Sequence, residues 1–332
     1  MSAGGRAAAA PGVPAARERS IGWRVIAAKE VADHLLSTRF AVLLLLVALA
    51  AVGSVYAASG AIREIAERAQ EAPSLFLQVF TAAPERVPSF LTLVGFLAPL
   101  LGVAFGFDAV NGERAQRTLP RLVAQPIRRD DVINGKFVGG LAVIVAVLTA
   151  LTLIVAGLSI VRLGITPTAD EAGRLLAWLI LTAVYVGFWL AFATLWSVVL
   201  RRAATSALVS ISLWLVLTLF AGFLVGLVAD AVAPVPDSPT VEEVLRNARL
   251  QQWLGRLSPA ILYEEATVVL LNPQIRTVGI VLPRQVDQAI PSPLPLDQSL
   301  LVVWPQIVGL VALCVLCFAA AYVLFMRQEI RA

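Results

Sequence analysis

Six long apolar runs dominate the sequence, and none of them contains an Asp, Glu, Lys, Arg or His residue. The runs hold about 19 to 27 residues each and cover residues 40–58, 89–107, 137–161, 175–200, 203–229 and 300–326. An α-helix rises about 1.5 Å per residue, so even the shortest run nearly crosses a hydrocarbon core of about 30 Å. Because a single helix satisfies its own backbone hydrogen bonds in lipid, we expect six transmembrane helices.

The composition agrees with this expectation. The 332 residues are 59% hydrophobic and only 14% charged, whereas a soluble domain carries about 25% charged residues. The expected fold class is therefore an all-α polytopic membrane protein. Residues 1–20 are mostly Ala, Gly, Pro and Arg, and we interpret them as a disordered cytoplasmic tail. Residues 21–332 then form one membrane domain.

Basic residues indicate the orientation of the spans, because short cytoplasmic segments are enriched in Lys and Arg. Sixteen basic residues lie in the N-terminal segment, the loops after the second and fourth spans, and the C-terminus. The loops after the first and third spans contain five. We therefore expect both termini, and the loop between the second and third spans, to be cytoplasmic.

Residues 22–39 precede the first span and have the pattern of an amphipathic helix. Its apolar stripe consists of Ile21, Val25, Ala28, Ala32 and Leu35, at steps of three and four. One interpretation is an interfacial helix, lying in the membrane plane, that also contacts a cytoplasmic partner. The other is a simple anchor that leads into the first span, and the two are compatible.

The segment 230–299 is expected to be a large extracytoplasmic loop between the fifth and sixth spans. It contains two predicted helices, one with Thr240 as its N-cap and one that begins at Ser258-Pro259 and ends at Asn272-Pro273. The loop is interpreted either as a helical cap over the spans or as a lid or binding site for an extracytoplasmic partner.

Small residues and a proline recur along one side of the second span, at Gly95, Pro99, Gly102 and Gly106. Small residues allow helices to approach closely, and proline removes a helical hydrogen bond. This stripe predicts either tight helix packing or a hinge.

The absence of charge inside the spans bears on function. An ion-driven carrier needs buried ionisable groups to bind its coupling ion, and charge within a membrane is costly unless it is used. Energy for any transport would therefore enter from outside the spans. The chain contains no G-x-x-x-x-G-K-[ST] phosphate-binding loop and a single histidine, so we expect it to bind neither a nucleotide nor a metal cofactor. We expect no nucleic-acid partner.

The most charged stretch, GERAQRTLPRLVAQPIRRDDVINGK, lies between the second and third spans. Its pattern predicts two short helices with a break at Gln125-Pro126, and the second helix runs from Arg129 into the third span. Its mixture of Arg and Leu suits a protein contact. It equally suits a solvated connector that only sets the topology.

This stretch resembles the permease subunits of ABC-2-type ABC transporters, which carry a pattern of the form D-x-x-x-x-E…T-L-x-x-L-L-x-x-P-(I/L)-x-R…G-K after their second span. The matching residues are Asp108, Glu113, Thr118-Leu119, Leu122-Val123, Pro126-Ile127, Arg129 and Gly135-Lys136. Lys29-Glu30 and Asp33 resemble the opening of the same family. Within it, the chain is similar to permeases of the nitrous-oxide-reductase maturation (NosY-like) type. It departs from the pattern at Arg117, where the family usually has Gly, and at Pro120, where it often has Glu.

The resemblance implies an ATP-driven transport subunit, with export as its direction, in a prokaryotic plasma (inner) membrane. Separate ATPase subunits would bind ATP and Mg²⁺, and a second permease subunit would complete a homodimer or heterodimer. The N-terminal helix and the hairpin would contact the ATPase. The residues that carry this contact by resemblance are Lys29, Glu30, Asp33, Glu113, Thr118, Leu119, Leu122, Pro126, Ile127, Arg129 and Lys136. Two alternatives are a force-transmitting membrane scaffold that acts on an extracytoplasmic partner, and a secondary carrier.

Overall fold

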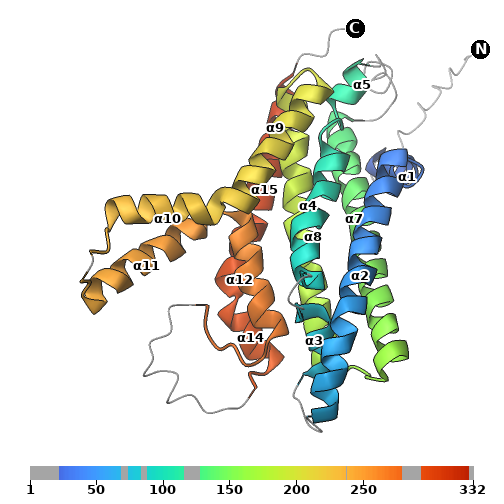
Figure 1. The fold of residues 1–332 in the computed structure, drawn as a ribbon. Coiled ribbons are helices and arrows are strands. Elements are labelled where there is room, and N and C mark those ends of the chain that lie inside the picture. The colour runs from blue at the N-terminus through green and yellow to red at the C-terminus, as the bar shows by residue number, and fades with distance from the viewer. Residues whose placement is uncertain are drawn as a thin grey trace, which may run out of the picture.

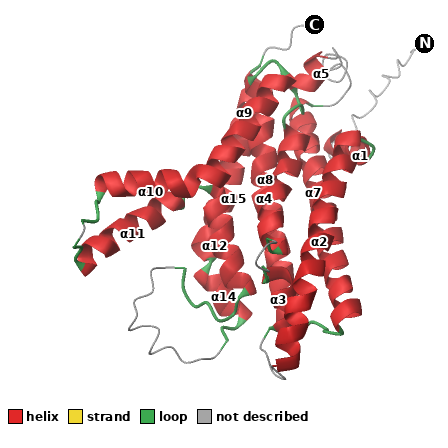
Figure 2. Ribbon diagram, in the orientation of Figure 1, coloured by secondary structure: helices red, strands yellow, loops and turns green. Residues whose placement is uncertain are grey.

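A computed structural model describes residues 22–68, 74–83, 88–115, 128–236, 238–278 and 293–328. Every regular element in these ranges is a helix, as Figure 2 shows. The expected tail at 1–20 lies outside them. The helices, drawn in Figure 1, are α1 Gly22–Leu35, α2 Thr38–Arg68, α3 Leu75–Thr81, α4 Phe90–Gly106, α5 Asn111–Ala115, α7 Arg129–Leu163, α8 Ala169–Val199, α9 Ala203–Leu215, the π-helix η2 Val216–Phe220, α10 Ala221–Val232, α11 Val241–Gly255, α12 Pro259–Leu271, α14 Leu296–Val302 and α15 Trp304–Arg327.

The prediction of an all-α polytopic membrane protein is confirmed. Within the described residues, five helical segments are long and apolar enough to cross a membrane, beginning at Phe90, Arg129, Ala169, Ala203 and Trp304. A sixth is obtained if α1 and the start of α2, which meet at 63°, are counted as one broken span. Helix α8 is central, because it packs against α4, α7, α12 and α15.

The sequence predicts two of the loop helices in detail. Helix α11 begins after Thr240, whose hydroxyl accepts a hydrogen bond from the Glu243 backbone N–H, and the Glu243 carboxylate accepts one from the Thr240 N–H in return. This capping box satisfies two donors that a helix start leaves free. Helix α12 begins after Ser258 and ends before Asn272, as predicted.

The first span differs from its expected bounds. We expected it to end at residue 58, but α2 is one helix of 31 residues that ends at Arg68. Gly60 lies just beyond the expected end and does not interrupt the helix. A single glycine costs a helix only about 1 kcal/mol relative to alanine, and the residues that follow it are good helix formers without proline.

The fifth span, expected as residues 203–229, is not straight. The helical segment Ala203–Val232 is long and apolar enough to cross a membrane, but the π-helix η2 separates α9 from α10 within it. Figure 1 shows α10 leaving the bundle sideways and α11 folding back along it. The Asn247 side chain joins the two, donating to Asp230 Oδ1 at 2.9 Å and to the Ala233 carbonyl at 2.8 Å. We call this pair the α10–α11 arm.

The loop 230–299 does not lie wholly beyond the spans, as a cap would. Helix α12 packs beside α8 and α15, and its Leu262 and Tyr263 are buried. Arg174 of α8, fully buried, holds the far end of α12: it donates to the Leu270 carbonyl at 2.9 Å and to Ser299 Oγ of α14 at 3.1 Å. A cation is favourable at a helix C-terminus. The apolar sequence of α12 explains its insertion, because most of its surface gains from burial.

Candidate functional site: the charged end of the bundle

Lys136 joins three helices at one end of the bundle, the predicted cytoplasmic end. Its Nζ lies 2.7 Å from Glu30 Oε1 of α1 and 2.8 Å from Glu113 Oε1 of α5. The Lys136 side chain is only 7% exposed. A buried charge must be paired, because the cost of removing it from water is offset only by partners in good geometry. The network therefore ties α1 and α5 to the start of α7.

Two glycines of α7 let α1 come close enough for this pairing. A Cβ on Gly135 would lie 2.7 Å from the Trp23 carbonyl oxygen, and one on Gly139 would lie 2.9 Å from the Ala27 carbonyl oxygen. Any larger residue would push α1 away from α7. The Gly135-Lys136 pair of the sequence pattern thus has a physical role: the first residue allows the approach and the second provides the cation.

A small apolar cluster lies beside this network and includes Ile26 of α1, Val132 and Ile133 of α7 and Phe325 of α15. Helix α1 packs against the bundle through Ile26 and Ala27. The predicted apolar stripe is therefore on another face, and Val25 and Leu35 are 55% and 50% exposed. That face is open to lipid or to another chain, so the interfacial role of α1 stays a prediction.

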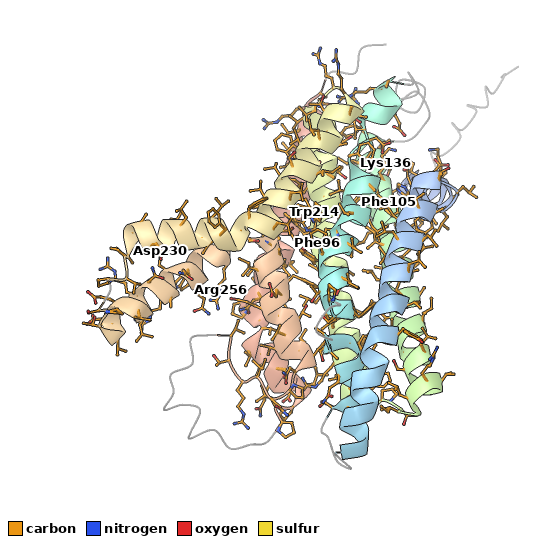
Figure 3. All side chains as sticks on the ribbon, viewed as in Figure 1. Phe96, Phe105, Lys136, Trp214, Asp230 and Arg256 are labelled. Atoms are coloured by element: carbon orange, nitrogen blue, oxygen red, sulfur yellow. The ribbon has the colours of Figure 1, made fainter. Side chains whose placement is uncertain are left out.

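A pocket of about 280 Å³ opens between α1, α4, α5 and α7, and Phe105 and Lys136, which Figure 3 labels, are among its lining residues. Lys29, Asp33 and Asp108 line it, and Lys29 Nζ lies 2.8 Å from Asp33 Oδ2. His34 stacks on Phe105 at 4.1 Å between ring centroids. Burial lowers the pKa of His34 below its ordinary value although Glu30 is nearby, which favours the neutral imidazole. Within the described residues, no group of three or more His, Cys, Asp or Glu side chains could hold a metal ion.

Arg129 lies at the start of α7 and donates from Nη1 to the Gln328 carbonyl at 3.1 Å, joining α7 to the end of α15. The remaining hairpin residues of the predicted contact, Thr118, Leu119, Leu122, Pro126 and Ile127, lie in the segment 116–127, outside the described residues. The structure thus brings Lys29, Glu30, Asp33, Glu113 and Lys136 together at one pocket, with Arg129 at the adjacent helix end.

Ser197 of α8 also belongs to this end of the bundle, and the sequence patterns do not predict it. Its hydroxyl accepts hydrogen bonds from the backbone N–H groups of Val110 and Asn111, at 2.9 and 3.2 Å. These donors belong to the start of α5, where a helix leaves its N–H groups free. Ser197 thus caps a helix 87 residues earlier in the chain. No local sequence pattern reveals such a cap, because donor and acceptor meet only in the folded bundle.

The stripe on α4 lies at a tight helix contact. A Cβ on Gly102 would meet the Val186 carbonyl oxygen at 2.6 Å, and one on Gly106 would meet the Leu190 carbonyl oxygen at 2.7 Å. Gly95 instead faces Tyr263 of α12, and Pro99 is buried within the helix. Close packing explains Gly102 and Gly106. A hinge at Gly95 and Pro99 stays a prediction.

These features define a helical membrane protein in which a buried ion-pair network organises one end of the bundle. Residues 24–330 match the family described as ABC-2 family transporter protein, and the chain belongs to this family. It is 28% identical, over 244 residues, to the probable ABC transporter permease protein NosY of Stutzerimonas stutzeri, and the match covers 72% of this chain and 78% of that protein. It is 32% identical, over 114 residues, to the protein of the same name from Pseudomonas aeruginosa, with 34% and 37% of the two chains covered.

Proposed function

We propose that this chain is the membrane subunit through which separate ATPase subunits, holding ATP and Mg²⁺, drive a substrate across the membrane, with export as the direction. The observation that carries the proposal is the Lys136 network. Helix α1 leads into α2, α5 follows α4, and Lys136 begins the apolar part of α7. Movement imposed on this end by a partner would therefore reach three spans at once.

The family supports a transport subunit, and the uncharged spans argue against a secondary carrier. Both termini are then cytoplasmic, as the arginine distribution predicts, and the chain contributes no catalytic residue of its own. The alternative of a force-transmitting scaffold is compatible with the same coupling end. It differs in its output, because the moving part would act on an extracytoplasmic partner rather than on a solute.

Replacing both Leu119 and Leu122 with aspartate tests the coupling surface. These leucines form the apolar side of the predicted hairpin helix, and two carboxylates there would oppose an apolar contact with the ATPase. We expect the variant to lose most of the co-purifying ATPase and its coupled activity while keeping its elution profile in detergent. Leu257→Asp is the control, because Leu257 is 75% exposed and lies far along the chain from the hairpin. Unchanged ATPase binding and activity in the double variant would contradict the proposal.

A second copy of this chain is the partner that the α10–α11 arm fits best. Val241, Glu242, Arg246 and Arg249 lie on one exposed face of α11 and line a shallow groove. In an antiparallel pair of α11 helices related by a twofold axis between Leu245 and Arg246, Glu242 of each copy lies opposite Arg249 of the other. Such an interface is self-complementary, as a twofold dimer requires.

A charge exchange tests this interface. Glu242→Arg or Arg249→Glu alone would place like charges opposite each other twice. We expect each to weaken dimer formation about fivefold, since the two exposed pairs that are broken contribute about 0.5 kcal/mol each. The double variant restores opposite charges and should recover the dimer. The measurement is the concentration-dependent dimer fraction in detergent. If the three variants match the unmodified chain, α11 is not the dimer contact and its face is free for an external partner.

A further inference from the structure

The proline in α4 leaves one backbone carbonyl without its helical donor. In a regular helix the N–H of residue 99 would bond to the carbonyl of Gly95, but Pro99 has no N–H. Pro99 is buried in the bundle. An unpaired carbonyl at such a depth is costly in a membrane protein, because no water reaches it. The Gly95 carbonyl therefore requires another donor.

Tyr185 of α8 supplies that donor. Its hydroxyl donates to the Gly95 carbonyl oxygen at 3.2 Å, across 90 residues of sequence. The Tyr185 side chain is fully buried, so this hydroxyl is held within the bundle. The proline-interrupted turn of α4 and the position of Tyr185 are thus linked by one hydrogen bond.

The ring of Tyr185 is held in turn by α12. It stacks on Tyr263, with ring centroids 4.3 Å apart and ring planes 9° from parallel. The Tyr263 hydroxyl accepts a hydrogen bond from Trp178 Nε1 at 3.0 Å and lies 3.0 Å from the Thr182 hydroxyl. Tyr263 also fills the space beside Gly95, where a Cβ would lie 3.1 Å from its Cε1 atom. Helices α4, α8 and α12 therefore meet at this pair of tyrosines.

The π-helical turn η2 in the fifth span is contacted by the start of α12. In η2 the π-helical turn disturbs the regular hydrogen-bond ladder, and Ser258 Oγ, at the start of α12, donates to the Leu217 carbonyl at 2.7 Å. One short helix thus touches both the proline site of α4 and the π-helical turn η2.

We propose that Tyr185 is a positioning residue that links α4 at its proline, Pro99, to the seating of α12. If α12 withdraws, Tyr263 releases the Tyr185 ring, and the Gly95 carbonyl loses its donor. If α4 flexes at Pro99, the Gly95 carbonyl moves away from Tyr185 and the stack with Tyr263 is disturbed. The hinge interpretation of Gly95 and Pro99 thereby gains a specific mechanism, in which Gly102 and Gly106 are the packed part of the helix.

Helix α4 carries this link toward the charged end. It ends at Gly106, a few residues before α5, and Glu113 of α5 pairs with Lys136. A displacement of α5 would reach α12 through α4. This last step rests on the proposed coupling function, whereas the link between Tyr185, Gly95 and α12 does not.

A double-mutant cycle tests the hydrogen bond without any ATPase. Tyr185→Phe keeps the ring and removes the hydroxyl, and Pro99→Ala restores a backbone N–H for the Gly95 carbonyl. We expect Tyr185→Phe to lower the Tm of the purified chain in detergent by several degrees. In the Pro99→Ala background it should have less than half of that effect, because the carbonyl then has its helical donor. Pro99→Gly restores the same N–H and replaces Pro99→Ala if that variant does not fold.

Tyr263→Phe is the matched control of the cycle. It removes a neighbouring buried hydroxyl whose partners are Trp178 and Thr182. Its effect on Tm should therefore be the same in the unmodified chain and in the Pro99→Ala background. An equal effect of Tyr185→Phe in both backgrounds would overturn the assignment of its hydroxyl to the Gly95 carbonyl.

Hydrogen exchange then tests the connection to α12. Tyr185→Phe should speed amide exchange in two separate segments, around residues 95–99 and in 259–271, and leave α7 unchanged. Faster exchange in the first segment alone would overturn the link to α12. In the complex with its ATPase, the same variant should lower the substrate-linked ATPase rate. If Tyr185→Phe lowers the ATPase rate but has no effect on Tm or on hydrogen exchange, the residue acts only in coupling and the proposed link to α12 is rejected. If the unmodified chain binds no ATPase, only the proposed function is rejected.

Discussion

Lys136→Met is expected to leave little stably folded protein. The substitution keeps most of the length of the side chain and removes its charge, so that Glu30 and Glu113 stay at the buried site as like charges without the cation between them. Only the exposed Lys29, whose Nζ lies 3.7 Å from Glu30 Oε1, stays near. Breaking a buried ion pair by removing one partner costs about 3–5 kcal/mol, which is a large part of the stability of most domains. We expect a lower Tm and faster proteolysis between α1 and α2, because α1 loses its polar contact with α7.

Lys29→Met is the matched control. Lys29 makes the same kind of pair with Asp33, but its side chain is 54% exposed, and exposed pairs contribute at most about 1 kcal/mol. A triple variant, Lys136→Met with Glu30→Gln and Glu113→Gln, removes all three charges and should recover much of the lost stability. If Lys136→Met proves as stable as Lys29→Met, the network does not hold the three helices together.

Gly102→Val should disrupt the bundle at its centre. The atoms nearest to a Cβ at this position are the Val186 carbonyl oxygen at 2.6 Å and the Leu190 backbone nitrogen at 2.9 Å. Overpacking a core costs about 1–3 kcal/mol when side chains can move aside, and the cost is greater here because a helix backbone must move. We expect the variant to lose most of its monodisperse fraction in size-exclusion chromatography.

Gly157→Val in α7 is the control for this prediction, since no atom lies within 4 Å of a Cβ at Gly157. It carries the same change in helix propensity and in apolar volume. Equal yields of the two variants would show that α4 and α8 are not in close contact. A Gly102→Val protein that folds well but no longer couples to its ATPase would instead favour a hinge along the whole stripe.

Residue patterns predict the elements of this protein better than their mutual positions. The uncharged runs predict α4, α7, α8 and α15 because length and apolarity are local properties. Capping patterns at Thr240 and Ser258-Pro259 predict the starts of α11 and α12 for the same reason. The extension of α2 to Arg68 was missed because a single glycine is a weak helix breaker.

At the charged end of the bundle, too, the sequence predicts which residues take part but not how they are paired. The resemblance to the family's sequence pattern predicts one shared site for Lys29, Glu30, Asp33, Glu113 and Lys136. The pairing of Lys136 with two particular carboxylates is instead a property of the fold. The amphipathic stripe of α1 does not show which face packs on α7. The packed face of α1 is instead set by Gly135 and Gly139 of α7, which leave room for its backbone.

By itself, the sequence determines that this chain is a helical membrane protein with its charge concentrated outside the spans, since a charge within lipid and an unpaired backbone are both too costly to occur by chance. It also shows that Pro99 leaves the Gly95 carbonyl without a helical donor. Only the tertiary structure decides that Tyr185 provides the replacement, that Ser197 caps α5, and that Tyr263 of α12 lies against α8. Each of these contacts joins residues more than 80 positions apart, and such contacts depend on how helices pack rather than on any local pattern.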